Sequence, residues 1–322
     1  MSDFWSTFTG MDTALSAVSE YICRATASSN PIIKEAISEL FEHQGKMLRP
    51  LMLLLASQFG NPDPKRIYPL ATAVELLHTA TLIHDDVIDD SPLRRGRPAL
   101  HMRYGKKDAV LIGDFLLSRC FLVAAEYTTP QNALNLGRAI SAICAMELDQ
   151  DADRFKPSIS VRTYLRKIIG KTALLFSLAC HVGAAEANAT FQVTERLRRI
   201  GYNIGMAFQI IDDILDYTGN EAELKKPVGN DLRAGLVTLP LICALRKDQE
   251  GVLTNLVTTE NFPQSDIPTI ISLTKELGGI EEARHYAQQY TERALREIAQ
   301  LPPGKARQNM EQLAKKLLIR SY

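Results

Sequence analysis

The chain has 322 residues, of which 46% are hydrophobic and 23% charged, as in ordinary globular proteins and unlike disordered or fibrous chains. Its 37 basic and 37 acidic residues give a formal net charge of zero, so no overall basic field would attract nucleic acid or an anionic membrane. Any affinity for phosphate groups must therefore come from a local cluster of charges.

The chain carries no obvious targeting or redox signal. Met1 to Trp5 lack the basic start of a secretory signal, and the strongest apolar run, Leu51 to Ala56, is too short to span a bilayer. The five cysteines are too widely spaced for a metal or redox pair and are expected to be small buried hydrophobes in a reducing compartment. We expect a cytoplasmic protein without a transmembrane segment.

Long stretches with apolar residues at three-to-four spacing predict helices. In chain order these stretches are Leu70 to Ile88, Asp108 to Tyr127, Leu134 to Leu148, Val161 to Ala185, Val193 to Tyr217, Leu236 to Leu245 and Glu281 to Leu301. Alternating strand patterns, low-complexity linkers and fixed-period repeats are not evident. The sequence therefore predicts one all-α domain over residues 1–322.

Two of these helices end in clusters of aspartates. The first cluster includes Asp85, Asp86 and Asp89, and the second includes Asp212, Asp213 and Asp216. The first and last acid of each cluster are four residues apart, so they lie on one face of a helix and repel each other. A single cluster of this kind is usually a solvated helix end, but two matching clusters after apolar helices favour binding of a divalent cation.

The chemistry of these clusters favours magnesium. Carboxylate oxygens in ones and twos, completed by water and substrate phosphates, are the ligands that Mg²⁺ prefers. No set of histidines and cysteines accompanies the acids, which argues against zinc.

Basic residues in short groups complete a set suited to binding diphosphates. Each residue alone would be read as a surface charge, but together with two acidic faces they fit a diphosphate site. His78 lies two helical turns before Asp85 and can point to the same side of its helix. The basic residues are Lys46, Arg49, Arg94, Arg95, Lys171 and Lys226.

Over essentially its whole length the sequence resembles the trans-prenyltransferase, or polyprenyl synthetase, family. The resemblance rests on two Asp-Asp-x-x-Asp motifs, at Asp85–Asp89 and Asp212–Asp216, and on Leu93-Arg94-Arg95-Gly96 after the first motif. It is strengthened by segments in the family order, which are Gly113–Leu117, Lys171-Thr172, Phe208-Gln209, Lys226–Leu232 and Val237–Pro240. The family's Gly-Gly-Lys-Arg-Leu-Arg-Pro segment is altered here by Gln44 and Met47, and a usual glycine is replaced by Lys225.

Within the family the chain is most similar to long-chain synthases, such as the large component of heptaprenyl diphosphate synthase. The closer likeness lies in the segment Arg162–Lys167 ahead of Lys171-Thr172. The resemblance implies the isoprenoid synthase fold, a bundle of antiparallel helices around a central catalytic cavity. It implies a homodimer, with a heterodimer containing a small companion subunit as the alternative.

The family reaction adds isopentenyl diphosphate to an allylic diphosphate such as farnesyl diphosphate, giving an all-trans polyprenyl diphosphate for quinone side chains. By resemblance, about three magnesium ions per active site would be bound by Asp85, Asp89 and Asp212. Asp86, Asp213 and Asp216 would bind through water or orient other ligands.

The remaining roles are also implied by resemblance. Arg94, Lys171 and Lys226 would bind the allylic diphosphate. Thr172 and Gln209 would turn oxygen dipoles toward the allylic cation. The isopentenyl diphosphate would be held by Lys46, Arg49, His78 and Arg95. Leu77, Ala80 and Thr81 precede Asp85 and would control product length, because small residues at 80 and 81 leave room for a long chain.

Two alternatives remain open at this point. A terpene cyclase has a similar helical fold and one aspartate-rich motif, but the second complete motif and the second diphosphate set argue against it. A non-catalytic subunit that modulates a synthase is the other alternative, although such a subunit is expected to lose metal ligands, and here all are present.

Overall fold

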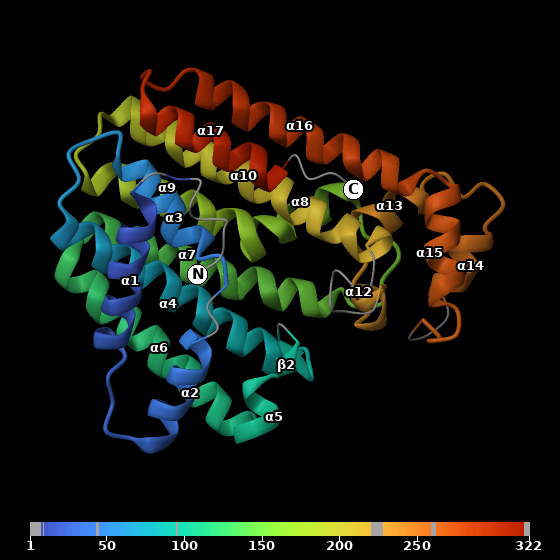
Figure 1. Ribbon diagram of the computed structural model, residues 1–322. Coiled ribbons are helices and arrows are strands. Elements are labelled where there is room, and N and C mark those ends of the chain that lie inside the picture. Colours follow the sequence, from blue (N-terminus) through green and yellow to red (C-terminus); the bar gives the residue numbers. More distant parts are fainter. Residues whose placement is uncertain are drawn as a thin grey trace. The chain divides into compact units, whose positions relative to one another are not determined.

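The structure, a computed structural model, describes residues 8, 10–42, 45–94, 96–219, 228–258 and 262–318, apart from the side chains of 150–152. Helices dominate the described residues, which confirms the all-α prediction (Figure 1). The first helices are α1 (Met11–Ala25), α2 (Pro31–Glu42), α3 (Leu48–Ser57), α4 (Pro64–Ile88), α5 (Leu100–Tyr104), α6 (Lys106–Tyr127) and α7 (Pro130–Ala152). Those that follow are α8 (Val161–Ile168), the π-helix η1 (Ile169–Ala173), α9 (Leu174–Glu186) and α10 (Phe191–Thr218). The last are α12 (Asn230–Arg233), α13 (Leu239–Leu245), α14 (Val252–Thr258), α15 (Ile267–Glu276), α16 (Gly279–Ala299) and α17 (Lys305–Leu318).

One small sheet interrupts the helices, and the sequence pattern did not predict it. Strands β1 (Leu93–Arg94) and β2 (Arg97–Pro98) form an antiparallel hairpin in which Leu93 pairs with Pro98. The hairpin follows α4 directly, so it places Arg94 close to the first aspartate motif in the chain.

The described residues fall into two compact units. Unit 1 draws on Met1–Arg138, Leu175–Gly201 and Ile298–Met310, and unit 2 on Ala139–Leu174, Tyr202–Glu297 and Glu311–Tyr322. Each unit therefore combines segments that are distant in the sequence. The single domain over residues 1–322 stays a prediction.

In unit 1, helix α4 is the central element. The Asp63 side chain caps its first turn by accepting a hydrogen bond from the backbone N–H of Lys65 at 3.0 Å, and Pro64 occupies the first helical position. From Ile67 to Leu77 nearly every residue is buried, and α6 packs along the helix. The middle turns of α4 are therefore largely apolar on most sides, whereas charged residues gather at its start and at the aspartates of its end.

The predicted helix from Val161 to Ala185 is divided in the structure into α8, η1 and α9. The wider π-helical turn of η1 contains Lys171 and Thr172, and such turns often occur at functional sites. The continuous run Val161–Glu186 is long and apolar enough to cross a membrane by length and composition, but 72% of its apolar window is buried in the protein. Buried core helices of globular proteins also meet these criteria of length and composition.

Three of the five cysteines match the expectation of buried hydrophobes. Burial raises the pKa of the Cys120, Cys180 and Cys243 thiols to about 12, so these thiols are unreactive. The expectation is wrong for Cys23 and Cys144, which are exposed on α1 and α7. Both helices present polar faces to solvent, and a small thiol is tolerated there.

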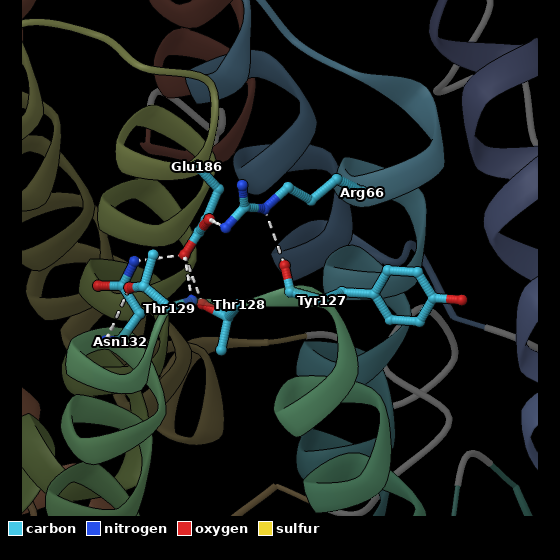
Figure 2. Close-up of polar contacts among 6 residues, drawn as sticks. All are labelled: Arg66, Tyr127, Thr128, Thr129, Asn132 and Glu186. Carbon is cyan, nitrogen blue, oxygen red and sulfur yellow. Dashed lines mark hydrogen bonds and ion pairs between the residues drawn. The ribbon is translucent and has the colours of Figure 1, made fainter.

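A buried carboxylate joins three helices of unit 1 at the start of α4 (Figure 2). Glu186, at the end of α9, has a side chain only 1% exposed and pairs with Arg66 of α4. It also accepts hydrogen bonds from the Thr128 hydroxyl, the Thr129 backbone N–H and the Asn132 side-chain amide. Arg66 in turn donates to the carbonyl oxygen of Tyr127 at 2.9 Å, so both ends of the α6–α7 connection are fixed.

We predict that Glu186→Ala destabilises the protein by about 3–5 kcal/mol, because Arg66 and three further donors lose their acceptor in a buried site. Urea unfolding followed by circular dichroism measures the change. The matched control is Glu20→Ala, which removes an exposed acid paired with Arg24 on α1 and should cost less than about 1 kcal/mol. Equal losses for the two variants would contradict a stabilising role for the Glu186 network.

Candidate active site

Two residues predicted to bind isopentenyl diphosphate lie in direct contact in unit 1. Arg49, in the first turn of α3, is 2.9 Å from Nε2 of His78 on α4. A guanidinium can only donate, so Nε2 of His78 accepts and the imidazole is neutral in this arrangement. Arg49 also lies over the ring of Phe176, 4.9 Å from its centre. The nearby Lys46 is exposed.

The acids of the first motif separate into two environments. Asp85 and Asp89 are half-buried, and Asp89 ends α4 by donating its backbone N–H to the carbonyl oxygen of Asp85 at 2.8 Å. Asp86 is buried and binds the guanidinium of Arg94 through both carboxylate oxygens. The helical rotation of about 100° per residue accounts for this division, because it turns Asp86 away from the face that carries Asp85 and Asp89.

The pair formed by Asp86 and Arg94 borders a cavity of about 120 Å³ in unit 1. Other lining side chains come from α2, α4 and the hairpin, and they include Glu39, Phe41, Glu75, Thr79, Leu82, Ile83 and Arg97. The predicted length-controlling residues are not among those that line it. Leu77 and Ala80 are almost fully buried, and Thr81 is half-buried with its hydroxyl donating to the carbonyl oxygen of His78.

In unit 2 two of the predicted catalytic residues, Thr172 and Gln209, belong to a chain of short hydrogen bonds. The Thr172 hydroxyl is 2.6 Å from Oε1 of Gln209, whose Nε2 donates to Oδ1 of Asp213 at 2.7 Å. The Tyr164 hydroxyl donates to Oδ2 of the same carboxylate at 2.6 Å. All four side chains are buried. A small cavity of about 30 Å³, roughly the volume of one water, borders this chain and is also lined by Lys171.

Lys171 lies among carboxylates. Burial lowers the pKa of its ammonium, but Asp231, Asp213, Glu147 and Asp212 outweigh this, and the pKa is raised above its ordinary value. The side chain nevertheless retains solvent access. Lys171 is therefore a permanent cation placed beside the second motif, as a diphosphate-binding role requires.

The second motif shows the same division of its acids as the first. Asp212 is exposed, whereas burial raises the pKa of Asp213 to about 7, and Asp231 acts in the same direction. Burial also raises the pKa of Asp216 to about 7. The Asp216 carboxylate accepts the backbone N–H groups of Asn230 and Asp231 at the start of α12, at 3.1 and 3.0 Å.

The sequence argument did not single out Tyr164 or Asp231 as site residues. Tyr164 lies between Arg162 and Arg166 in the sequence of α8, and only the structure shows that it is buried and bonded to Asp213. Asp231 lies in a quoted family segment, but its proximity to Lys171, Asp213 and Asp216 depends on the position of α12. Arg95 and Lys226 lie outside the described residues, so their predicted roles stay predictions.

The donors present suit magnesium better than a metal with a complete protein cage. Within the described ranges, no three histidine, cysteine, aspartate or glutamate side chains converge into a group that could hold a metal ion. Mg²⁺ commonly binds through one or two carboxylates and completes its shell with water and substrate phosphates. The face shared by Asp85 and Asp89, and the exposed Asp212, fit that mode of binding.

Comparisons with known proteins agree with these features. A family model described as polyprenyl synthetase matches residues 30–274. Heptaprenyl diphosphate synthase component 2 of Geobacillus stearothermophilus is 38% identical over 96% of both chains. The crystal structure of heptaprenyl diphosphate synthase from Staphylococcus aureus has a TM-score of 0.92 at 33% identity, covering 97% of this chain and 98% of that one. Geranylgeranyl pyrophosphate synthase from Lactobacillus brevis has a TM-score of 0.93 at 39% identity, covering 99% of both.

We predict that Gly205→Ala lowers turnover by roughly 10-fold or more, because a Cβ at Gly205 would lie 2.6 Å from Cα of Ala173. Gly205 is one turn before Gln209, so the added methyl group would move η1 away from α10 and lengthen the contact between Thr172 and Gln209. Steady-state kinetics measure the effect. In the control Gly137→Ala the methyl group meets no atom within 4 Å, and the variant should be stabilised by about 0.5–1 kcal/mol with unchanged turnover. Unchanged turnover in Gly205→Ala would contradict the requirement for close packing.

Proposed function

Because the chain belongs to the polyprenyl synthetase family and is therefore a prenyltransferase, we propose that it is a magnesium-dependent, all-trans long-chain polyprenyl diphosphate synthase. It would add isopentenyl diphosphate repeatedly to an allylic diphosphate such as farnesyl diphosphate. The product would serve as the precursor of a quinone side chain, and the enzyme would act in the cytoplasm.

One observation carries this proposal beyond the family assignment. Arg49 and His78 are in contact, and His78 precedes Asp85 by two turns on one face of α4. A second anion site next to the first aspartate motif suits an enzyme with two diphosphate substrates. A terpene cyclase has one such substrate, so this pair favours the synthase.

In the proposed reaction, bound Mg²⁺ would neutralise the diphosphate that leaves the allylic substrate. Asp85, Asp89 and Asp212 would hold the metal. Arg94, positioned by Asp86, and Lys171, positioned among its acids, would add positive charge to the same diphosphate. We further propose that Lys226 does so too.

Cleavage of the allylic carbon–oxygen bond leaves a cation, which Thr172 and Gln209 would stabilise with their oxygen dipoles. Lys46, Arg49, His78 and Arg95 would hold isopentenyl diphosphate with its double bond close to that cation, and this positioning would supply much of the acceleration. Attack of that double bond on the cation would form the new carbon–carbon bond, and the departed diphosphate would accept the proton whose loss restores a double bond.

The exposed apolar side chains of α6 support the proposed homodimer. Val110 and Leu111 lie three turns from Phe121 and Leu122, and all four are exposed. A stripe of this kind on one helix is unusual for a monomer and suits contact with a second copy of the chain. The name of the Geobacillus relative, component 2, suggests that a companion subunit acts with that protein.

The direct test incubates the purified chain alone with Mg²⁺, isopentenyl diphosphate and farnesyl diphosphate and then sizes the products. We expect a long-chain polyprenyl diphosphate.

Asp85→Ala and Asp212→Ala should each lower turnover by about 100-fold or more, because each removes a carboxylate proposed to hold Mg²⁺. Both should keep the helical fold. Asp12→Ala, which removes an exposed acid of α1, is the control and should behave as the parent. Near-normal synthesis by either motif variant would contradict the metal assignment. Absence of product from the parent alone would fit both the modulating-subunit alternative and a catalytic chain that needs a companion subunit.

Product length has its own test. The relatives include synthases named for heptaprenyl and for geranylgeranyl products, so similarity alone does not decide between them. We propose a product longer than geranylgeranyl diphosphate, because Ala80 and Thr81 are small.

We predict that Ala80→Phe shortens the product toward the farnesyl-to-geranylgeranyl range while the first condensation stays fast. The added ring would block a chain growing along α4 past the buried Ala80. Thin-layer chromatography of the dephosphorylated products measures the length. Ala299→Phe, at an exposed position of α16, is the control and should give the parental product. A parental product from Ala80→Phe would show that the growing chain does not pass this residue.

A further inference from the structure

We propose that Asp213 and Tyr164 are positioning residues that fix the direction of the hydrogen bond between Thr172 and Gln209, and thereby turn the lone pairs of the Thr172 oxygen toward the reacting substrate. The inference rests on the proposed function, in which these oxygens face the allylic cation. It assigns the second acid of the second motif to this task and not to metal binding.

The direction of the relay begins at Asp213. The Tyr164 hydroxyl donates to Oδ2 of Asp213 at 2.6 Å, and Nε2 of Gln209 donates to Oδ1 at 2.7 Å, so both carboxylate oxygens accept. Because the carboxylate accepts, Gln209 must turn its NH₂ group toward Asp213 and its oxygen toward Thr172.

The second step follows from the first. The amide oxygen of Gln209 only accepts, so the Thr172 hydroxyl must donate its hydrogen along the 2.6 Å contact. The lone pairs of the Thr172 oxygen then point away from Gln209. With the amide reversed, Thr172 would accept from Gln209 and would present its hydrogen on the other side, where it would repel a cation.

Burial and geometry explain why this direction is stable. Asp213, Tyr164 and Thr172 are each 4% exposed, so exchange with bulk water does not readily replace these partners. Both carboxylate oxygens of Asp213 are already hydrogen-bonded to protein donors. A role as a direct metal ligand would use the second lone pair of one of these oxygens, in a side chain that is only 4% exposed.

An exchange of acid and amide tests the relay. Asp213→Asn leaves the direction of the amides unfixed and should lower kcat by roughly 10-fold or more, with little change in KM for either diphosphate. In the double variant Asp213→Asn/Gln209→Glu, the new amide at position 213 donates to the new carboxylate at position 209, and that carboxylate also accepts from Thr172. The direction at Thr172 is restored with the same net charge, so kcat should recover most of the loss.

Two tyrosines provide the matched controls. Tyr164→Phe removes one donor to Asp213 and should lower kcat without changing the concentration of Mg²⁺ needed for half-maximal rate. Tyr217→Phe removes another fully buried tyrosine hydroxyl, which accepts a long hydrogen bond of 3.4 Å from Thr238, and should leave kcat unchanged. A double variant as slow as Asp213→Asn, with a raised Mg²⁺ requirement, would overturn the relay in favour of a metal-binding role.

A second measurement does not depend on activity. In the parent, the side-chain NH₂ signal of Gln209 in nitrogen-15 NMR should be shifted by its bond to the carboxylate, and Asp213→Asn should remove that shift. An unshifted signal in the parent would overturn the proposal. If the parent is active but the double variant does not recover kcat, the result counts against the relay alone. If the parent is inactive but the Gln209 signal is shifted as expected, the result counts against the proposed function alone.

Discussion

The cost of burying carboxylates at the ends of apolar helices is the constraint on which the rest of the structure depends. Each buried acid must receive donors or cations, because an unpaired charge in such a place is strongly destabilising. Asp86 receives Arg94, Asp213 receives Tyr164 and Gln209, and the half-buried Asp216 receives two backbone N–H groups of α12. The segments that follow the two motifs are positioned by these demands.

The two motifs use their acids in the same way. In each, the first acid keeps contact with solvent, whereas the second is buried and holds a neighbouring residue of the proposed site. Asp86 holds Arg94, and Asp213 holds Gln209. The rotation of about 100° between adjacent residues makes this division almost unavoidable when one side of the helix faces packed neighbours. Stabilising the motif and preparing the site are thus accomplished by the same bonds.

Close packing of backbones is the second requirement. The π-helical turn η1 brings Thr172 to Gln209, and this approach depends on Gly205, whose missing side chain lets Ala173 lie against α10. A helical glycine costs about 1 kcal/mol relative to alanine. The gain is a contact of 2.6 Å between two side chains that the proposed chemistry uses.

The sequence by itself determined the all-α fold, the main helices and both aspartate faces, because the helical period and the spacing of Asp85 and Asp89 are local properties. It also indicated Arg49 and His78, which the structure places in contact. Only the tertiary structure decided that Tyr164 and Asp231 approach the second motif, that Arg94 pairs with Asp86, and that the helix at Lys171 widens into a π-turn. These features depend on contacts between residues distant in the chain, and no local pattern of side chains encodes such contacts.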